Sequence, residues 1–338
     1  MNEKHYNTLI NLGFREFSDV STTTNINHIT SRKRICGIYC LVVDDNMFYI
    51  GKSDHIGRRF LDHKKTYEKI QTFSFFECDK DNLDKAEQHC IHKADEAGAK
   101  ILNILHATHP LFKTPLDDLI SPDEQEEWLA DEACYFDGDR KEESLHNERV
   151  RIKGEARFNR FQSDVDRDFL IEICAEYTIA TILAPFTTEC EYWGVSCLPS
   201  TARFLPGYST LFCFNIYRME TFVMLCNDKI RAAHAHICVA RSTLRQEFGT
   251  EQAVLDAYPC AYFPDFFYKS AGYDQIVVTF TDYNDMHKVL SDWRIVRAAR
   301  VMNLRLMKKG RNLFKQYHSF QLADRVLEKL KEWTIESA

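Results

Sequence analysis

The sequence predicts a protein of the α/β type, more narrowly α+β, in which a small N-terminal sheet domain precedes a larger mixed α+β domain. Length is the first observation, because 338 residues suffice for two or three domains and a sizeable core. Composition is the second: 45% hydrophobic and 13% aromatic residues are typical of a folded chain. Third, short runs of alternating apolar residues occur in both halves of the chain and predict strands.

The cysteines and the hydropathy pattern indicate a cytoplasmic protein with no membrane contact. The twelve cysteines include no CxxC pair and no regular spacing, so we expect reduced thiols scattered through cores. No apolar run approaches the roughly 18 residues of a membrane span. The N-terminal residues contain no apolar stretch of the signal-peptide type.

Composition divides the chain into four regions. Residues 1–34 are polar, end in the basic run SRKR, and predict an N-terminal arm. Residues 35–105 have a compact pattern of strands and helices. An acidic connector is predicted at 106–150, because 117–143 holds twelve acidic and two basic residues. Residues 151–338 form the second predicted domain, with an α+β pattern and basic C-terminal helices.

A tight hairpin is predicted at residues 37–51, which read GIYCLVVDDNMFYIG. Apolar residues on both sides of an Asp-Asp-Asn turn favour two antiparallel strands joined by a three-residue loop. This register pairs Tyr39 with Gly51. It also pairs Leu41 with Tyr49, so both tyrosines point to one face. The opposite face is more apolar, and we therefore expect both tyrosines to face away from the main hydrophobic layer.

A helix, a third strand and a second helix are predicted after the hairpin. Residues 57–71 have helical character, and residues 72–78 alternate like a strand. Residues 81–98 open with capping residues and end at Gly98, which suits a helix C-terminus. Glu87 lies one turn into this second helix, on the side expected to face the sheet. A carboxylate in that position is either paired or functional.

Taken in chain order, these residues resemble the GIY-YIG nuclease family. Gly-Ile-Tyr lies at 37–39, and Tyr-Ile-Gly at 49–51 is followed by Lys52. An arginine follows eight residues after Gly51, a histidine four residues later, a glutamate on the next long helix, and an asparagine shortly beyond it. The resemblance covers residues 35–105 and implies a small three-stranded antiparallel sheet flanked by helices. The site residues that it implies are Tyr39, Tyr49, Arg59, His63, Glu87 and Asn103.

The arginine of this series has two candidates, since Arg58 and Arg59 are adjacent. We choose Arg59 because it precedes His63 by four residues, which places both side chains on one stripe of a helix. Its planar, permanently charged guanidinium suits the scissile phosphate. The resemblance further implies Mg²⁺ as the cofactor, with Mn²⁺ as a substitute. Glu87 is then the metal ligand, because Mg²⁺ binds through one or two carboxylates and keeps several waters.

The remaining roles also follow from the resemblance. Tyr39 is expected to take a proton from the attacking water if nearby cations lower its pKa from about 10. The resemblance does not fix which tyrosine is the general base, and we favour Tyr39. Tyr49 and His63 are expected to hydrogen-bond phosphate or water, and Asn103 to brace the site. Taken singly, a surface tyrosine or a helical arginine is more often a packing or solvated residue.

Contacts to a nucleic acid are predicted mainly near the C-terminus. Residues 1–105 hold 15 basic and 15 acidic residues, so bulk charge there does not favour a polyanion. Residues 293–323 instead contain eight Lys or Arg residues and no acid. They are interpreted as a phosphate-tracking helix, or alternatively as an amphipathic core helix with a solvated basic face. The predicted contacts are Lys52, Arg294, Arg297, Arg305, Lys308, Lys309 and Arg311.

Two further patterns lie in the second domain. A zinc site is weighed because histidines and a cysteine alternate along a predicted strand, with two cysteines upstream. Ligand spacing of the CxxC kind is missing, so partly buried histidines are favoured over a metal. The residues concerned are His234, His236, Cys238, Cys190 and Cys197. Residues 190–212 hold two prolines and several aromatic residues, and are interpreted as a binding loop.

The sequence therefore predicts a metal-dependent endonuclease that hydrolyses phosphodiester bonds in DNA, with residues 151–338 selecting the target. DNA is preferred to RNA because the family predominantly cuts DNA. Restriction or anti-phage defence, mobile-element homing and repair are settings open to such a protein. One metal site cuts one strand at a time, so a double-strand break needs a homodimer or two successive events. Two alternatives stay open: a catalytically vestigial nucleic-acid-binding regulator, and an interaction scaffold.

Overall fold

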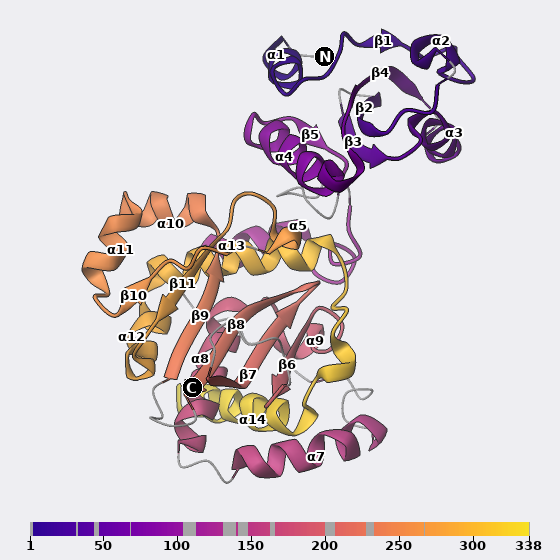
Figure 1. Cartoon of the computed structure of the whole chain (residues 1–338). Coiled ribbons are helices and arrows are strands. Elements are labelled where there is room, and N and C mark those ends of the chain that lie inside the picture. The colour runs from indigo at the N-terminus through magenta and orange to yellow at the C-terminus, as the bar shows by residue number, and fades with distance from the viewer. Residues whose placement is uncertain are drawn as a thin grey trace. The chain divides into compact units, whose positions relative to one another are not determined.

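The chain folds as α+β and divides into two compact units, each described here by itself (Figure 1). The first unit comprises residues 1–113 and 269–273, and the second comprises 114–268 and 274–338. A computed structural model describes residues 3–31, 33–43, 47–67, 69–103, 113–130, 140, 148–162, 166–199, 207–227, 233–266 and 268–337. Most of the predicted acidic connector lies outside these residues.

The first unit is built on a mixed sheet of five strands in the order β1-β4-β2-β3-β5. The three central strands, β4, β2 and β3, are antiparallel, as predicted. The sheet differs from the three strands expected because β1 and the parallel β5 extend its edges. These additions have two residues each, too few for a periodic signal. The strands are β1 (Ser18–Asp19), β2 (Gly37–Val43), β3 (Met47–Ser53), β4 (Ile70–Glu77) and β5 (Lys100–Ile101).

The predicted hairpin register is confirmed. Tyr39 lies opposite Gly51, and Leu41 lies opposite Tyr49. Val43 lies opposite Met47, so residues 44–46 connect the strands, and they lie outside the described part of the chain. The helices of this unit are α1 (Glu3–Asn11), α2 (Asn27–Thr30), α3 (Ile56–Thr66) and α4 (Leu83–Glu96).

Two apolar layers cover the two faces of this sheet. Ile38, Phe48 and Ile50 pack with Ile91 of α4 on one face. Tyr39 packs on the other face with apolar residues of α3, β4 and the N-terminal segment, and it is only 1% exposed. The expectation that the tyrosines face away from the hydrophobic layer is therefore wrong for Tyr39. A sheet covered on both faces buries each alternate set of side chains.

The N-terminal residues form part of this core rather than a separate arm. Leu9 and Phe14 belong to the layer beside α4. Val20 and Ile26 belong to the layer that contains Tyr39. These four buried residues are spread over a mostly polar segment and show no helical or strand periodicity, which is why composition alone suggested an arm.

The second unit is built on an antiparallel sheet in the order β10-β11-β9-β8-β7-β6. Its strands are β6 (Trp193–Cys197), β7 (Tyr208–Ile216), β8 (Met219–Asn227), β9 (Ala233–Val239), β10 (Ala261–Tyr262) and β11 (Ile276–Phe280). The helices are α5 (Pro122–Ala130), α7 (Glu148–Gln162), α8 (Arg167–Thr181), α9 (Pro185–Thr188), α10 (Arg241–Phe248), α11 (Glu251–Ala257), α12 (Met286–Ser291), α13 (Trp293–Lys309) and α14 (Phe320–Ser337).

Helices α8, α13 and α14 pack against this sheet and against one another (Figure 1). The ring of Tyr177 on α8 lies 4.9 Å from that of Phe214 and 4.6 Å from that of Phe222, measured between centroids. These two strand residues therefore mark the helix-covered face. The opposite face carries more polar residues, among them Ser196, Asn215 and Glu220.

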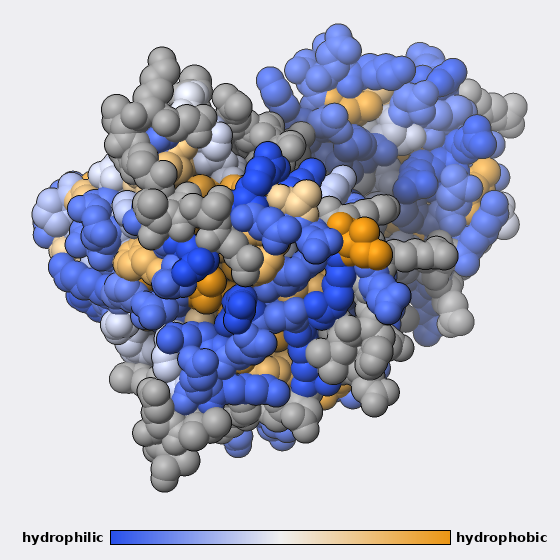
Figure 2. Space-filling model, turned by 90° about the horizontal axis from the view of Figure 1, so that it is seen from below, coloured by the Kyte–Doolittle hydropathy of each residue, from blue (hydrophilic) through white to orange (hydrophobic). Residues whose placement is uncertain are grey.

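Figure 2 shows one face of the molecule as mostly hydrophilic, with apolar side chains in small separate patches. Scattered apolar side chains are normal on a protein surface and do not by themselves mark a docking site. Among the described helices, none is long and apolar enough to cross a membrane.

Candidate active site

Tyr39 and His63 form the centre of the candidate site. β2 carries Tyr39 and α3 carries His63, whose side chains meet with 2.7 Å between the Tyr39 hydroxyl and Nε2 of His63. The ring of Tyr49 lies 4.5 Å from the imidazole of His63, and Tyr67 stacks on the imidazole at 5.8 Å between centroids. Two strands and one helix thus gather four ring side chains on one face of the sheet.

Gly51 is required by the close approach of these rings. A Cβ atom at this position would lie 2.5 Å from the Tyr39 hydroxyl oxygen and 2.8 Å from Cε1 of Tyr49. Real Cβ contacts essentially never fall below 3.0 Å. The glycine of the Tyr-Ile-Gly tripeptide therefore has a steric reason at this site, since any side chain would displace a tyrosine.

Arg59, rather than Arg58, faces the tyrosines. A hydrogen bond to Tyr39 raises the pKa of Arg59, and so does the charge interaction with both tyrosines. The contacts of Arg58 involve its backbone, whose N–H donates to Nδ1 of His55 at 3.3 Å at the start of α3. The structure therefore places the second arginine of the pair against the ring cluster, as the four-residue spacing to His63 predicts.

The electrostatics of the cluster overturn one expectation. Burial, followed by the neighbouring Tyr49, raises the pKa of Tyr39 above its usual value, although Arg59 opposes the shift. Desolvation by burial lowers the pKa of His63 to about 4, and Arg59 contributes in the same direction. Tyr39 is thus a protonated phenol at neutral pH, not the activated phenolate expected, because desolvation outweighs the nearby cation.

The proton between these residues can be assigned from donor chemistry. A guanidinium can only donate, so the Tyr39 oxygen accepts from Arg59. The hydroxyl hydrogen then points to Nε2 of His63, which accepts as a neutral imidazole. This assignment gives the proton of Tyr39 a defined acceptor.

Glu87 on α4 lies at the edge of β3, where it contacts Lys52, the residue after Gly51. Its Oε1 accepts from the backbone N–H of Lys52 at 3.2 Å, and its Oε2 lies 2.7 Å from the Lys52 ammonium. Asp84, one turn earlier on α4, lies 2.5 Å from the same ammonium. Two carboxylates of α4 therefore hold one cation at this edge. Glu87 is 9% exposed, so it belongs to the minority of acids that are buried with a partner.

Asn103 holds the same strand edge. Its Nδ2 donates to the carbonyl of Ile50 at 2.6 Å, and its Oδ1 accepts from the N–H of Ile50 at 3.0 Å. Ile50 lies between Tyr49 and Gly51, so this pair of hydrogen bonds fixes the strand that carries them. Asn103 is therefore a bracing residue, because both Oδ1 and Nδ2 of its side chain hydrogen-bond to the backbone of Ile50.

Sequence reasoning missed Asp84 and left Tyr67 outside the site. Asp84 and Glu87 are three residues apart on a helix, which is a visible signal for one shared face. Tyr67 follows His63 by four residues and so continues the stripe of Arg59 and His63. The ring stacking on His63 gives it a place in the cluster.

The cations predicted to follow a nucleic-acid backbone are engaged with acidic side chains. α13 is a core helix on which Lys309 is only 6% exposed. Five of the predicted cations form ion pairs: Arg294–Asp292 at 2.7 Å, Arg297–Glu247 at 2.5 Å, Arg305–Asp274 at 2.6 Å, Lys308–Asp117 at 3.1 Å and Arg311–Glu191 at 3.0 Å. Acids outside the run thus pair with five of its eight cations, which leaves less of its charge for a nucleic acid.

The histidines weighed as zinc ligands have other partners. Nδ1 of His236 lies 2.6 Å from the hydroxyl of Thr279, and Nε2 of His234 lies 3.3 Å from that of Tyr208. Among the described residues, one group of three candidate ligands gathers elsewhere: Glu189, Cys190 and His318.

Hydrogen bonding argues against a metal at this last group. The N–H of Val195 lies 3.1 Å from Nδ1 of His318, and despite burial, hydrogen bonds to Cys190 and Glu189 raise the pKa of this imidazole to about 9, against the neutral form that a metal needs. Nε2 then donates to Glu189 at 3.0 Å and offers no lone pair to an ion. Arg140 binds both oxygens of that carboxylate. The group is a buried ion-pair network of the second unit, in which Arg140 is bound to Glu189.

Comparison with protein-family models, with curated proteins and with solved structures finds no match to this chain. The chemistry of the site therefore rests on its own geometry. Two phenols on β2 and β3 meet a permanent cation and a neutral imidazole on α3, and a carboxylate on α4 contacts the edge of β3 at Lys52. Such a set can neutralise an anion, move a proton and present oxygen ligands to a hard cation.

Proposed function

We propose that the first unit is a metal-dependent endonuclease of the GIY-YIG type that hydrolyses phosphodiester bonds in DNA. One observation carries the proposal: Arg59 and His63 contact the Tyr39 hydroxyl beside Gly51, where a side chain cannot fit, while a buried carboxylate contacts the next residue. A structural role alone does not require a cation, two phenols and an imidazole at one gap.

Arg59 binds the scissile phosphate in this proposal. It is exposed, its guanidinium interacts with two phenols, and its charge does not depend on pH in the physiological range. The phenols can donate to phosphoryl oxygens that gain charge in the transition state. Lys52 offers a further positive charge at the same edge once it leaves Glu87.

Proton transfer runs through Tyr39 and His63. The Tyr39 oxygen accepts a proton from the attacking water as its own hydroxyl proton passes to Nε2 of His63. This relay avoids a free phenolate, whose pKa in this buried position is unfavourable. The low pKa of His63 keeps the imidazole neutral at neutral pH, so its Nε2 has a lone pair directed at the Tyr39 hydroxyl.

The carboxylates of α4 fit a hard divalent cation such as Mg²⁺ or Mn²⁺. The carboxylate oxygens of Glu87 and Asp84 already bind the Lys52 ammonium. Oxygen atoms are also the ligands that Mg²⁺ prefers. When bound, such an ion would supply Lewis-acid stabilisation of the phosphoryl oxygens. Lys52 must then move from the carboxylates toward solvent or substrate, and its side chain is 37% exposed.

The Lys52–Glu87 ion pair also favours a second candidate function. A cation already bound to the only buried carboxylate of this site would suit a vestigial nuclease fold that binds nucleic acid without cutting it. Restriction or anti-phage defence and mobile-element homing remain settings for the active form. A regulatory or scaffold role is the setting for the inactive one.

A cleavage assay separates these functions. The full-length protein is incubated with end-labelled single-stranded DNA, double-stranded DNA and RNA in Mg²⁺, in Mn²⁺ and in EDTA. The proposal expects metal-dependent cutting that Glu87→Gln and Arg59→Ala reduce by at least 100-fold, since each removes charge stabilisation of the transition state. Glu96→Gln and Arg58→Ala are matched controls on the same two helices and should retain activity, because Glu96 forms an exposed pair with Lys93.

The same assay can overturn the proposal. Wild-type protein that binds the substrates but leaves all three uncut supports the vestigial function. Normal cutting by Glu87→Gln would remove the metal assignment. Equal loss in Arg58→Ala and Arg59→Ala would indicate general damage to α3 rather than a role for the cluster.

A further inference from the structure

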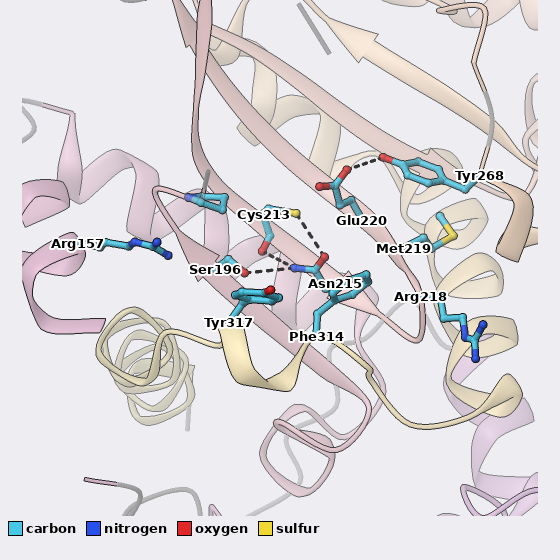
Figure 3. A pocket seen from close by; sticks show the side chains of 11 residues that line it. Arg157, Ser196, Cys213, Asn215, Arg218, Met219, Glu220, Tyr268, Phe314 and Tyr317 are labelled. Carbon is cyan, nitrogen blue, oxygen red and sulfur yellow. Dashed lines mark hydrogen bonds between the residues drawn. The ribbon is translucent and has the colours of Figure 1, made fainter. Parts of the chain in front are cut away.

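The second unit contains a cavity of about 440 Å³ on the more polar face of its sheet (Figure 3). Strands β6, β7 and β8 form its floor, and segments from α7, from residues 314–317 and from Tyr268 form its walls. This volume lies within the range of about 300–1,000 Å³ that is typical of small-molecule sites. The cavity lies wholly within the second unit and shares no residue with the candidate nuclease site.

An amide and a carboxyl group lie side by side on the floor. Asn215 of β7 lies directly opposite Glu220 of β8. The pairing register shifts at this point, because Phe214 pairs with Phe222 and leaves Thr221 as the extra residue. This bulge turns Glu220 to the face that bears Asn215 instead of the helix-covered face. Bulges that re-aim a side chain are common beside functional sites.

The floor is held in place by hydrogen bonds. Nδ2 of Asn215 donates to the hydroxyl of Ser196 at 3.4 Å, and Oε2 of Glu220 accepts from the hydroxyl of Tyr268 at 3.0 Å (Figure 3). Gln275 bonds both the N–H and the carbonyl of Tyr268 at 2.7 Å, which fixes that ring over the sheet. Burial raises the pKa of the Glu220 carboxyl above its usual value.

Two arginines that line the cavity have no acidic partner in the part of the chain that the structure describes. Arg157 enters from α7 and Arg218 from the turn between β7 and β8, and both are exposed (Figure 3). Neither has an ion pair with any described residue, and Arg218 lies over the ring of Tyr217 at 5.5 Å. The arginines of α13 described above are paired with acids, so these two stand out as available for an anion.

Aromatic side chains flank the opening. Phe314 and Tyr317 line the cavity from the segment between α13 and α14, and Tyr317 is 56% exposed. A large aromatic ring so exposed at a cavity wall offers a face on which a planar group can stack.

We propose that this cavity binds a nucleoside 5′-phosphate group, with the base on Asn215 and Glu220 and the phosphate on one of the two arginines that flank them, Arg157 or Arg218. A polar edge, a stacking face and two available guanidiniums match the three parts of that group: the hydrogen-bonding rim of the base, its ring and the phosphate. The site is separate from the nuclease cluster and does not depend on cleavage. Its ligand has two sources, a free nucleotide or a nucleotide turned out of a nucleic acid.

Calorimetry tests the shared chemistry with the full-length protein. The probes are the ribo- and deoxyribonucleoside 5′-monophosphates, the matching nucleosides and inorganic phosphate. At least one monophosphate should bind more tightly than its nucleoside and than phosphate. One of the two variants Arg157→Ala and Arg218→Ala should weaken it roughly tenfold, as expected for one lost charge-assisted hydrogen bond, and thereby identify the arginine that holds the phosphate; an unchanged affinity in both would contradict the phosphate position. Asn215→Ala should weaken binding and change the preference among bases.

Matched controls protect this test from structural damage. Arg325→Ala removes an exposed arginine of the same unit that is paired with Glu328, and should leave the affinity unchanged. Glu87→Gln in the first unit should also leave it unchanged, so failure of the nuclease proposal does not affect this one. Tryptophan fluorescence reports whether each variant keeps the second unit folded, because the four tryptophans lie at positions 128, 193, 293 and 333.

A second arm distinguishes the sources. Duplexes that carry 2-aminopurine at a matched or mismatched position become more fluorescent when that base is unstacked. An increase that Asn215→Ala abolishes assigns the site to an extruded nucleotide, whereas monophosphate binding without it assigns a free nucleotide. Absence of binding by every monophosphate and of any fluorescence increase, in a folded protein, would overturn the proposal. Equal binding of phosphate and monophosphates would reduce the site to a simple anion site and overturn it too.

Discussion

The hydroxyl of Tyr39 lies 2.7 Å from Nε2 of His63, and burial depresses the pKa of that imidazole to about 4. The fold thus places a protonated phenol on β2 against a neutral base on α3, although the two residues are 24 positions apart in the chain. The pair is hydrogen-bonded within a buried aromatic layer, so its protonation is linked to the stability of the first unit as well as to its chemistry.

The first prediction concerns the acid sensitivity of this pair. The folded pKa of His63 is about 4 and the unfolded value about 6.5, so the unfolded chain binds more protons between these values. The contribution of His63 is therefore complete above pH 6.5 and is lost as pH falls toward 4. The free energy of unfolding should drop by on the order of 2–3 kcal/mol over that window.

Comparison with His63→Gln isolates this effect. The buried His236 also has a pKa of about 4, but it is present in both proteins, so their difference removes its contribution. The wild type should lose stability more steeply than the variant between pH 6.5 and 4. An NMR titration of the His63 ring with a midpoint near 6.5 would contradict the prediction.

The second prediction concerns the steric gap at Gly51. Gly51→Ala forces a methyl group to within 2.5 Å of the Tyr39 oxygen, against atoms of a buried ring. Overpacking of this kind typically costs about 1–3 kcal/mol, and the displaced tyrosine should also lose its bond to His63. Hydrogen exchange of β2 amides should accelerate, and any cleavage activity should fall.

Gly57→Ala is the matched control for this change. Its Cβ would meet only the ring of His55 at 3.5 Å, an ordinary van der Waals distance. Gly57 lies inside α3, where alanine is favoured by up to about 1 kcal/mol. The control should therefore be neutral or stabilising. Equal damage by both alanines would show that the region tolerates no substitution, whatever the state of the ring cluster.

The third prediction concerns the strand edge at Ile50. Asn103→Leu removes both hydrogen bonds to the backbone of Ile50 and leaves two partly buried polar groups unpaired. Each such group costs about 1–3 kcal/mol when water cannot reach it. The amide of Ile50 should lose its protection from exchange, whereas that of Cys40 on central β2 should change little. Unchanged protection of Ile50 would mean that Asn103 does not hold β3.

Local sequence patterns sufficed for the centre of the first unit. Alternation and turn chemistry predicted the pairing of Tyr39 with Gly51, and helical spacing predicted that Arg59 and His63 share a stripe. Both patterns depend on neighbours close in the chain. The burial of Tyr39 could not be predicted in this way, because the layer that covers it includes Val20 and Ile26, from a segment without apolar period.

Long-range partners explain the other differences. The acid-free run that contains Arg305 and Lys308 suggested a surface for nucleic acid, but Asp274 and Asp117 neutralise these cations from remote segments. The cavity in the second unit depends on a register shift at Thr221, which has no signature in composition. Residues 190–212, interpreted as a binding loop, in fact contribute Ser196 on β6 to that cavity.

The last prediction concerns the buried ion pair of α13. Arg305 and Asp274 lie 2.6 Å apart, with side chains only 12% and 7% exposed, and Ser242 donates two further bonds to Asp274. Arg305→Ala leaves that carboxylate buried beside neutral donors, which typically costs about 3–5 kcal/mol. Arg325→Ala breaks an exposed pair with Glu328 instead and should cost less than about 1 kcal/mol. Urea unfolding followed by tryptophan fluorescence measures both in the second unit, and similar midpoints for the two variants would contradict a structural role for Arg305.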